Sequence, residues 1–195
     1  LLEYPLEERH LENITGSGGY DQRTRPDTVG AEPPYGPLEH RDDVVVFRTE
    51  ELQEDVAVAG PIRVTVYAAT TAKDTDFTAK LIHEYPPSEA FNDGFALNLT
   101  DSICRARYRG QRESPDFVEP GEIYESELEL SPTANVFQEG HRIRLDISSS
   151  NFPRYDVNRN TGTELYGGRS HEIAENTIYL DNNRPTHVEL PVLPH

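Results

Sequence analysis

Two stretches that alternate strictly between apolar and polar residues constrain the fold of this chain most strongly. Apolar residues take every second position of residues 62–68, which read IRVTVYA, and of residues 142–148, which read RIRLDIS. Successive side chains of a β-strand point to opposite faces, so this period indicates strands with one buried and one wet face. Each stretch runs into a polar loop of unusual composition, KDTDF at residues 73–77 and SSNFPRYDVNRNTG at residues 149–162.

Further strand signals recur between turn-forming residues from Val44 onward. The expected strands, about nine, cover residues 44–47, 62–68, 78–85, 96–99, 103–108, 124–130, 142–148, 177–180 and 188–192. The pair Pro86-Pro87 ends the third of them, because proline supplies no amide donor to a sheet. Short strands separated by turns, without an amphipathic helix of ten residues, predict an all-β sandwich, for which the jelly roll is a common solution.

Residues 1–43 differ from the rest of the chain. They hold few apolar side chains and two turn-forming runs, GSGG at residues 16–19 and EPPYGP at residues 32–37. We expect an extended arm over residues 1–43, laid on a larger body, followed by the sandwich over residues 44–195. A free linker is the alternative for the arm. The sequence contains no Met, and we expect a fragment of a longer protein.

The charge balance argues against nucleic acids and anionic membranes as partners. The chain has 35 acidic and 18 basic residues, for a formal net charge of −17, whereas both partners need clustered Lys and Arg. Lys73 and Lys80 are the only lysines. Abundant carboxylates with little lysine suggest a salt-loving prokaryotic source, where ionic strength screens self-repulsion. A high-GC genome is the alternative.

Sequence signals for export and membrane insertion are missing from the chain given. The first ten residues, LLEYPLEERH, carry acids where a secretion signal has an apolar run. No apolar run approaches the ~18 residues that a membrane-spanning helix requires. A cytoplasmic location is therefore predicted.

The sequence contains no complete pattern for a catalytic serine. A hydrolase nucleophile sits in G-x-S-x-G between a strand and a helix; the nearest candidate, Ser17 in TGSGG, has the wrong spacing. Seven histidines are present, but none is tied by sequence to a serine and an acid. The single cysteine, Cys104, is expected to be a small buried residue. No catalytic residue is predicted in this chain.

One sequence pattern resembles the start of a calcium-binding loop, but the residues that follow it do not complete that loop's pattern. Asp156, Asn158 and Asn160 form D-x-N-x-N, the opening of such a loop. The full pattern requires Gly at its sixth position and an acid at its twelfth, where this chain has Thr161 and Gly167. A looser oxygen-ligand site and a loop braced by its own Asx-type hydrogen bonds both stay open. No metal and no cofactor are predicted.

The KDTDF turn is predicted to be structural. We expect Asp74 to cap the turn, Asp76 to accept hydrogen bonds from the backbone or from arginine, and Phe77 to fill the core. A catalytic role for the two carboxylates would require a histidine beside them, and the sequence places none there.

The loop over residues 151–162 is predicted to be a docking surface rather than a ligand site. Its Phe-Pro step is stiff, because proline restricts the preceding residue to extended geometry. Its two arginines offer forked donors to a partner, and its tyrosine can anchor an interface. The interface candidates are Phe152, Arg154, Tyr155, Asn158 and Arg159. A self-braced surface loop is the alternative.

Five motifs in order between Arg41 and Pro194 resemble the C-terminal domain of the X-Pro dipeptidyl-peptidase / cocaine-esterase family of serine hydrolases. They are RDDVVVFRTEELQEDVAVAGPI, DTDFTAKL, CRARYRG, PGEIYESELELSPTANVFQEGHRIRLDISSSNFPRYDVNRNTG and HVELPVLP. The resemblance implies a jelly-roll domain, similar to galactose-binding domains, that lacks the catalytic triad. It also implies an α/β-hydrolase domain with Ser, Asp and His and a helical cap earlier in the same polypeptide. Members cleave X-Pro dipeptides, acyl esters or the side chains of β-lactam compounds.

Three functions follow from these observations. The resemblance implies a non-catalytic accessory domain that packs on and stabilises the hydrolase domain, and a homo-oligomer, since the domain helps to form the oligomer in some members. A carbohydrate-binding module is the alternative, with Tyr155 and Tyr166 replacing the absent Trp. A structural or assembly module is the third. An apolar patch beside the 151–162 loop would favour a partner domain, whereas a concave groove ringed by tyrosine would favour sugar.

Overall fold

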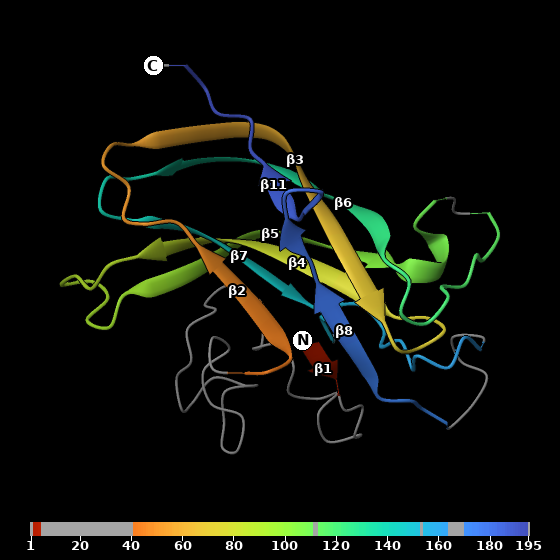
Figure 1. Cartoon of the computed structure of the whole chain (residues 1–195). Coiled ribbons are helices and arrows are strands. Elements are labelled where there is room, and N and C mark those ends of the chain that lie inside the picture. The colour runs from red at the N-terminus through yellow and green to blue at the C-terminus, as the bar shows by residue number, and fades with distance from the viewer. Residues whose placement is uncertain (1, 5–40, 111–112, 153, 164–169, 195) are drawn as a thin grey trace.

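The computed structural model of the chain describes residues 2–4, 41–110, 113–152, 154–163 and 170–194. This part of the chain consists of antiparallel strands in two main sheets, with one short 3-10 turn at Ala106–Tyr108 (Figure 1). The all-β class predicted from the alternating stretches is confirmed. Most of the predicted arm, residues 5–40, lies outside the described residues, and the arm stays a prediction. No helix in the described part is long and apolar enough to cross a membrane.

The first sheet is built around its longest strand, β3 (Val56–Thr70). Strand β6 (Tyr124–Phe137) pairs with β3 along one side. Strands β8 (Ala174–Ile178) and β11 (His187–Glu189) pair with different parts of its other side. Strand β1 (Leu2–Tyr4) continues the sheet beyond β8. With partners on both sides, β3 is the central strand of this layer.

The second sheet has four strands in a single row. In spatial order they are β2 (Val44–Arg48), β7 (Arg142–Ser148), β4 (Asp76–Tyr85) and β5 (Phe95–Arg105). A separate short ribbon joins β9 (Leu180–Asp181) to β10 (Arg184–Pro185). Strand β4 pairs with both β5 and β7, so it is an inner strand of this sheet. The KDTDF turn at its start therefore lies at the end of an inner strand and not at an edge of the sheet.

Apolar side chains of both sheets meet in one core. The apolar members of the alternating stretches point inward, as their period predicts, and each such side chain contributes roughly 1.5–3 kcal/mol when fully buried. The buried core consists of Val58, Ile62, Val64, Val66, Ala68, Phe77, Ala79, Leu81, Leu128, Leu130, Phe137, Leu145 and Ile147. Two sheets that share one core form a β-sandwich, so that prediction is confirmed. The jelly-roll connectivity and the likeness to galactose-binding domains stay predictions.

Several strands are longer than the sequence pattern predicted, among them β3, β5 and β6. Strand β3 continues back to Val56 because a bulge at Gly60 carries it past Pro61. Gly60 has φ 138°, and an added Cβ there would be 3.1 Å from Pro191, so only glycine fits this bulge without strain. Strand β5 unites the predicted strands 96–99 and 103–108, of which residues 106–108 instead form the 3-10 turn. Cys104 on this strand is half-buried rather than buried.

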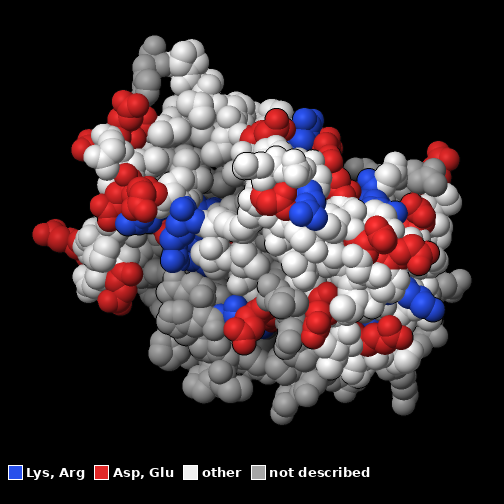
Figure 2. All heavy atoms as spheres, viewed as in Figure 1, with Lys and Arg blue, Asp and Glu red and all other residues white. Residues whose placement is uncertain are grey.

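On the face shown in Figure 2, acidic side chains are spread out, with basic ones beside many of them. Several of these neighbours form ion pairs between strands, such as Arg63 with Glu127 at 2.9 Å and Arg48 with Glu84 at 2.9 Å. Exposed pairs of this kind contribute about 0–1 kcal/mol each. They relieve part of the self-repulsion that a net charge of −17 creates.

The KDTDF turn and the loop over residues 151–162, which the sequence analysis singled out, lie at one end of the sandwich. Strand β3 ends there at Thr70, β4 begins there at Asp76, and β7 ends there at Ser148, which pairs with Thr78. We call the described residues of 71–75, 106–123 and 149–163 the loop end. The opposite end, which we call the hairpin end, consists of residues 49–55, 86–94 and 138–141.

Candidate functional site

Asp74 is buried at the loop end and paired with Arg107. Its Oδ1 accepts a hydrogen bond from the backbone N–H of Arg107 at 3.0 Å, and its Oδ2 accepts from Arg107 Nε at 2.8 Å. Arg107 is itself buried, and its NH2 group lies 2.7 Å from Asp74 Oδ2. A buried carboxylate needs such partners because its desolvation is costly. The pair therefore fastens the KDTDF turn to the 3-10 turn.

Asp76 makes a second buried ion pair beside the first. Arg105 Nε and NH2 donate to its two carboxylate oxygens, each at 2.9 Å. This two-pronged geometry fits a guanidinium to a carboxylate and fixes both orientations. Burial raises the pKa of Asp76, and the Arg105 guanidinium opposes that shift by favouring the charged carboxylate.

Asn158 links both ion pairs to the 149–163 loop. Its Nδ2 donates to Asp74 at 2.6 Å and to Asp76 at 2.8 Å, while its Oδ1 accepts from the Asn160 N–H at 2.9 Å. Arg107 NH2 also donates to the Thr163 carbonyl at 3.0 Å. We call Asp74, Asp76, Arg105, Arg107 and Asn158 the ionic clamp, because together they hold the loop against the start of β4.

The clamp changes the interpretation of one predicted interface residue. Asn158 was expected to face a partner, but the structure places its side chain inside the chain's own hydrogen-bond network. An interior amide with these partners cannot contact a second surface. We therefore remove Asn158 from the set of interface candidates.

The remaining residues of the D-x-N-x-N pattern also make contacts within the domain. Asp156 lies at the surface, with its Oδ2 3.4 Å from Arg105 NH2. Asn160 has φ 62°, and its Nδ2 donates to the Glu172 carbonyl at 2.9 Å. Its backbone N–H, bonded to Asn158, makes the Asx-type contact that was one of the two alternatives. In the described residues, no three His, Cys, Asp or Glu side chains are grouped as metal ligands.

The other interface candidates lie on the outside of the loop. Arg154 is exposed, and its Nε is 2.9 Å from Asp101 Oδ1 on β5. Its guanidinium carbon lies 5.8 Å from the ring centre of Tyr155, which is half-buried. Phe152 and Arg159 are also half-buried, and Pro153 lies outside the described residues. Arg154 thus braces the loop against the second sheet as well as facing outward.

Two exposed apolar side chains that the sequence analysis did not single out flank this loop. Phe117 is 42% exposed and lies against Gly162, where an added Cβ would be 3.4 Å from its ring. Ile173 is 62% exposed and follows Glu172, whose N–H donates to the Arg159 carbonyl at 3.0 Å. We call Phe117, Phe152, Arg154, Tyr155, Arg159 and Ile173 the candidate docking surface.

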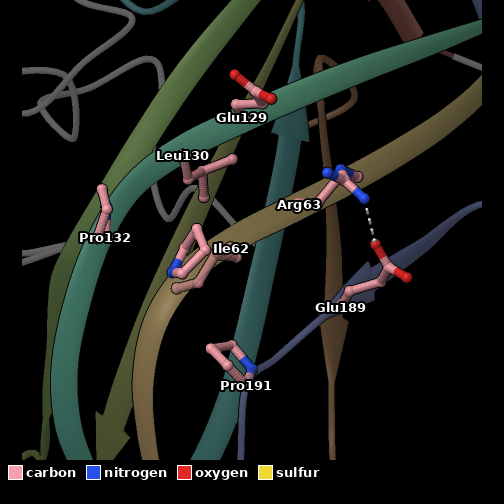
Figure 3. A pocket seen from close by; sticks show the side chains of 8 residues that line it. Ile62, Arg63, Glu129, Leu130, Pro132, Glu189 and Pro191 are labelled. Atoms are coloured by element: carbon pink, nitrogen blue, oxygen red, sulfur yellow. Dashed lines mark hydrogen bonds and ion pairs between the residues drawn. The ribbon is translucent and has the colours of Figure 1, made fainter.

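Two hollows lie away from this surface. The first, about 480 Å³, is at the β3 bulge and is lined by three prolines and by Arg63, which bonds Glu189 at 3.4 Å (Figure 3). The second, about 620 Å³, lies between β5 and β6 and includes Tyr108 and Glu129. No described residue of the 149–163 loop lines either hollow. The described residues of the candidate docking surface therefore line neither of these two hollows.

The sequence of this chain matches one protein family over most of its length. The family is described as the X-Pro dipeptidyl-peptidase C-terminal non-catalytic domain, and the match covers residues 9–189. The cocaine esterase of Rhodococcus sp. (strain MB1 Bresler) is 42% identical over 159 residues, which are 80% of this chain and 27% of that protein.

Solved structures of larger proteins contain the same fold. An α-amino acid ester hydrolase matches with TM-score 0.76 and 30% identity over 80% of this chain and 26% of its own. An aminopeptidase from the marine sediment archaeon Thaumarchaeota archaeon matches with TM-score 0.76 and 28% identity, over 90% of this chain and 32% of its own. A CocE/NonD family hydrolase from Staphylococcus aureus, 15% identical with TM-score 0.59, shares the fold alone. This chain therefore spans between about a quarter and a third of these proteins.

Proposed function

The chain belongs to the family of X-Pro dipeptidyl-peptidase C-terminal non-catalytic domains, and from this we propose that it packs through its loop end on an α/β-hydrolase domain of the same polypeptide. There it stabilises the hydrolase fold without contributing a catalytic residue. The whole protein, on this proposal, is a serine hydrolase of the dipeptidyl-peptidase or acyl-esterase type. Its relatives support the arrangement, because this chain corresponds to only 27% of the cocaine esterase and 26% of the ester hydrolase.

The observation that carries the proposal is the combination of a clamped loop and exposed apolar side chains. Buried ion pairs are costly to form and contribute geometry more reliably than stability. Here they fix a surface loop whose outer side carries Tyr155 and whose flanks carry Phe117 and Ile173. A surface that is ordered before binding loses less conformational entropy when a partner docks. Large apolar side chains beside such a loop are the expected centre of an interface.

The carbohydrate-binding alternative finds less support at this site. A sugar platform requires an aromatic face that a ligand can stack on, but Tyr155 is half-buried and has the Arg154 guanidinium 5.8 Å from its ring centre. Tyr166 lies outside the described residues. The hollow that contains Tyr108 is at the strand edges, and no described residue of the loop that follows β7 lines it.

Labelling with a serine-directed fluorophosphonate tests the proposal. In the product of the complete reading frame, we expect the label on a serine that precedes this chain and on no peptide from residues 1–195. Deleting residues 41–195 should lower the thermal midpoint of the hydrolase part by roughly 5–10 °C, because that part loses its packing partner. Label within residues 1–195, or an unchanged midpoint after deletion, would refute the proposal.

A further inference from the structure

Two histidines meet in the interior of the hairpin end, away from the docking surface. His83, near the end of β4, is 1% exposed. Its Nε2 lies 2.8 Å from Nδ1 of His141, which belongs to the turn between β6 and β7. The Nδ2 of Asn135, on β6, lies 3.1 Å from His83 Nδ1. The three side chains form one hydrogen-bonded row that joins the two sheets.

The donors and acceptors of this row are fixed by its first member. Because Asn135 Nδ2 can only donate, His83 Nδ1 must accept and carries no proton. The proton of neutral His83 is then on Nε2, which donates to Nδ1 of His141. Both rings are therefore neutral when the row is intact. A proton added to His141 Nδ1 would set two donors against each other and break that link, whereas a proton on His83 Nδ1 requires the Asn135 amide to turn its oxygen toward the ring.

The surroundings of the row offer a positive charge little compensation. His83 stacks on Tyr85 with ring centres 4.1 Å apart and lies 4.7 Å from the ring centre of Phe137. Charged residues near the two histidines include Glu84 and Arg142, which follow them in the chain, and Asp55, which acts on His141. Glu84 is already paired with Arg48 and Arg144. Asp55 acts on His141 but accepts a hydrogen bond from the Glu139 N–H at 2.8 Å.

The backbone around His141 holds two segments of the hairpin end together. The Leu52 N–H donates to the His141 carbonyl at 2.9 Å, and the Gly140 N–H donates to the Leu52 carbonyl at 2.9 Å. These bonds tie residues 49–55 to the 138–141 turn. Segments with few buried apolar contacts open more easily than core strands. The histidine row adds a side-chain link from the 138–141 turn to β4, beside the backbone pairing of Glu84 with Arg142.

We propose that the row Asn135–His83–His141 is an acid-operated latch, whose protonation releases residues 49–55 and 138–141 from the sandwich while the loop end stays closed. The latch sits at the end remote from the ionic clamp, whose groups are carboxylates and guanidiniums rather than histidines. Local opening at one end is therefore possible without loss of the docking surface. This inference is independent of the proposed function, because it concerns the domain alone.

The direction of the pH effect follows from the protonation states. Burial lowers the pKa of His83 to about 4; the neighbouring His141 adds to that shift, and the hydrogen bond with Asn135 opposes it. Burial also lowers the pKa of His141, while Asp55 opposes the change. In the open state the histidines titrate near ~6.5. The open state thus binds more protons between pH ~6.5 and ~4, so the closed state loses stability as the pH falls through that window.

Amide hydrogen exchange on this domain, corrected for the intrinsic effect of pH, tests the latch. Lowering the pH from 7 to 5 should reduce protection of the Leu52, Glu139 and Gly140 amides by about 20-fold, the factor expected when one pKa rises from about 4 to ~6.5 on opening. The loop-end amides of Val118 and Gly121 should keep their protection. An equal loss at both ends, or no loss at either, would overturn the proposal.

Two further measurements separate the latch from general acid sensitivity. The His83→Gln variant keeps neutral hydrogen-bonding groups and should abolish the pH dependence at Leu52 and Gly140. Titration of the histidine ring signals in the unmodified domain should place the protonation of His83 in the pH range in which protection is lost. A His83 ring that titrates near pH 6.5 without any change in exchange would overturn the latch, even if the variant did not fold.

Discussion

Replacing Asp74 with alanine is expected to lower the free energy of unfolding of this domain by about 3–5 kcal/mol, the usual cost of removing one partner of a buried ion pair. The substitution leaves Arg107 buried without its carboxylate and removes an acceptor from Asn158. It also leaves the Arg107 backbone N–H without its partner. Urea denaturation of the isolated domain measures the change directly.

Asp156→Ala is the matched control for this substitution. Asp156 also faces an arginine of the clamp, but its side chain is 47% exposed and its closest approach to Arg105 is 3.4 Å. Water replaces such a partner at little cost, so we expect a change below about 1 kcal/mol. If Asp74→Ala and Asp156→Ala lower the free energy of unfolding by similar amounts, burial of the ionic clamp does not determine how much the clamp stabilises the domain.

The double substitution Phe117→Asp and Ile173→Asp should separate this domain from the hydrolase part while leaving its own fold intact. Both side chains are exposed, at 42% and 62%, so carboxylates there cost little in the isolated domain. In an interface, the same two carboxylates would have to lose their water, at a cost of several kcal/mol. We expect the thermal midpoint of the complete polypeptide to fall by roughly 5–10 °C, close to the value after deletion of the domain.

Leu180→Asp provides the comparison for the docking substitutions. Leu180 is similarly exposed, at 59%, but lies in the β9–β10 ribbon rather than at the loop end. This variant should leave the midpoint of the complete polypeptide within about 1–2 °C of the unmodified protein. The thermal midpoints of the isolated domain and of the complete polypeptide are compared for the double variant and for Leu180→Asp. If each variant lowers both midpoints by the same amount, Phe117 and Ile173 support the domain's own fold and not an interface.

Local pattern was sufficient to predict most of the sandwich. The apolar positions of residues 62–68 and 142–148 are inside, because a period of two needs only neighbouring residues to be recognised. The middle of β5 was missed for the opposite reason. Residues 100–102 read TDS, which resembles a turn, but Asp101 is opposite Lys80 in the sheet and pairs with Arg154. Those partners are distant in sequence, and no local pattern reveals them.

In the candidate site too, local sequence predicts some features, whereas others depend on contacts between residues that are distant in sequence. An arginine partner was expected for Asp76, but only the sheet register identifies it as Arg105, 29 residues away. Asn158 was placed at the surface because its loop is polar, whereas the two buried carboxylates that hold it come from a different strand. Phe117 and Ile173 each precede a buried apolar residue, Val118 and Ala174, so their own exposure together at one end follows only from the fold.

The contact between the loop end and a hydrolase domain is tested most directly by hydroxyl-radical footprinting of Phe117. Its oxidation rate should be compared between the isolated domain and the product of the complete reading frame, with Leu180 as an internal reference in both. We expect Phe117 to react at least about fivefold more slowly in the complete product, because an interface excludes water from its centre, while Leu180 reacts equally in both. Equal rates for Phe117 in the two proteins would contradict docking through the loop end.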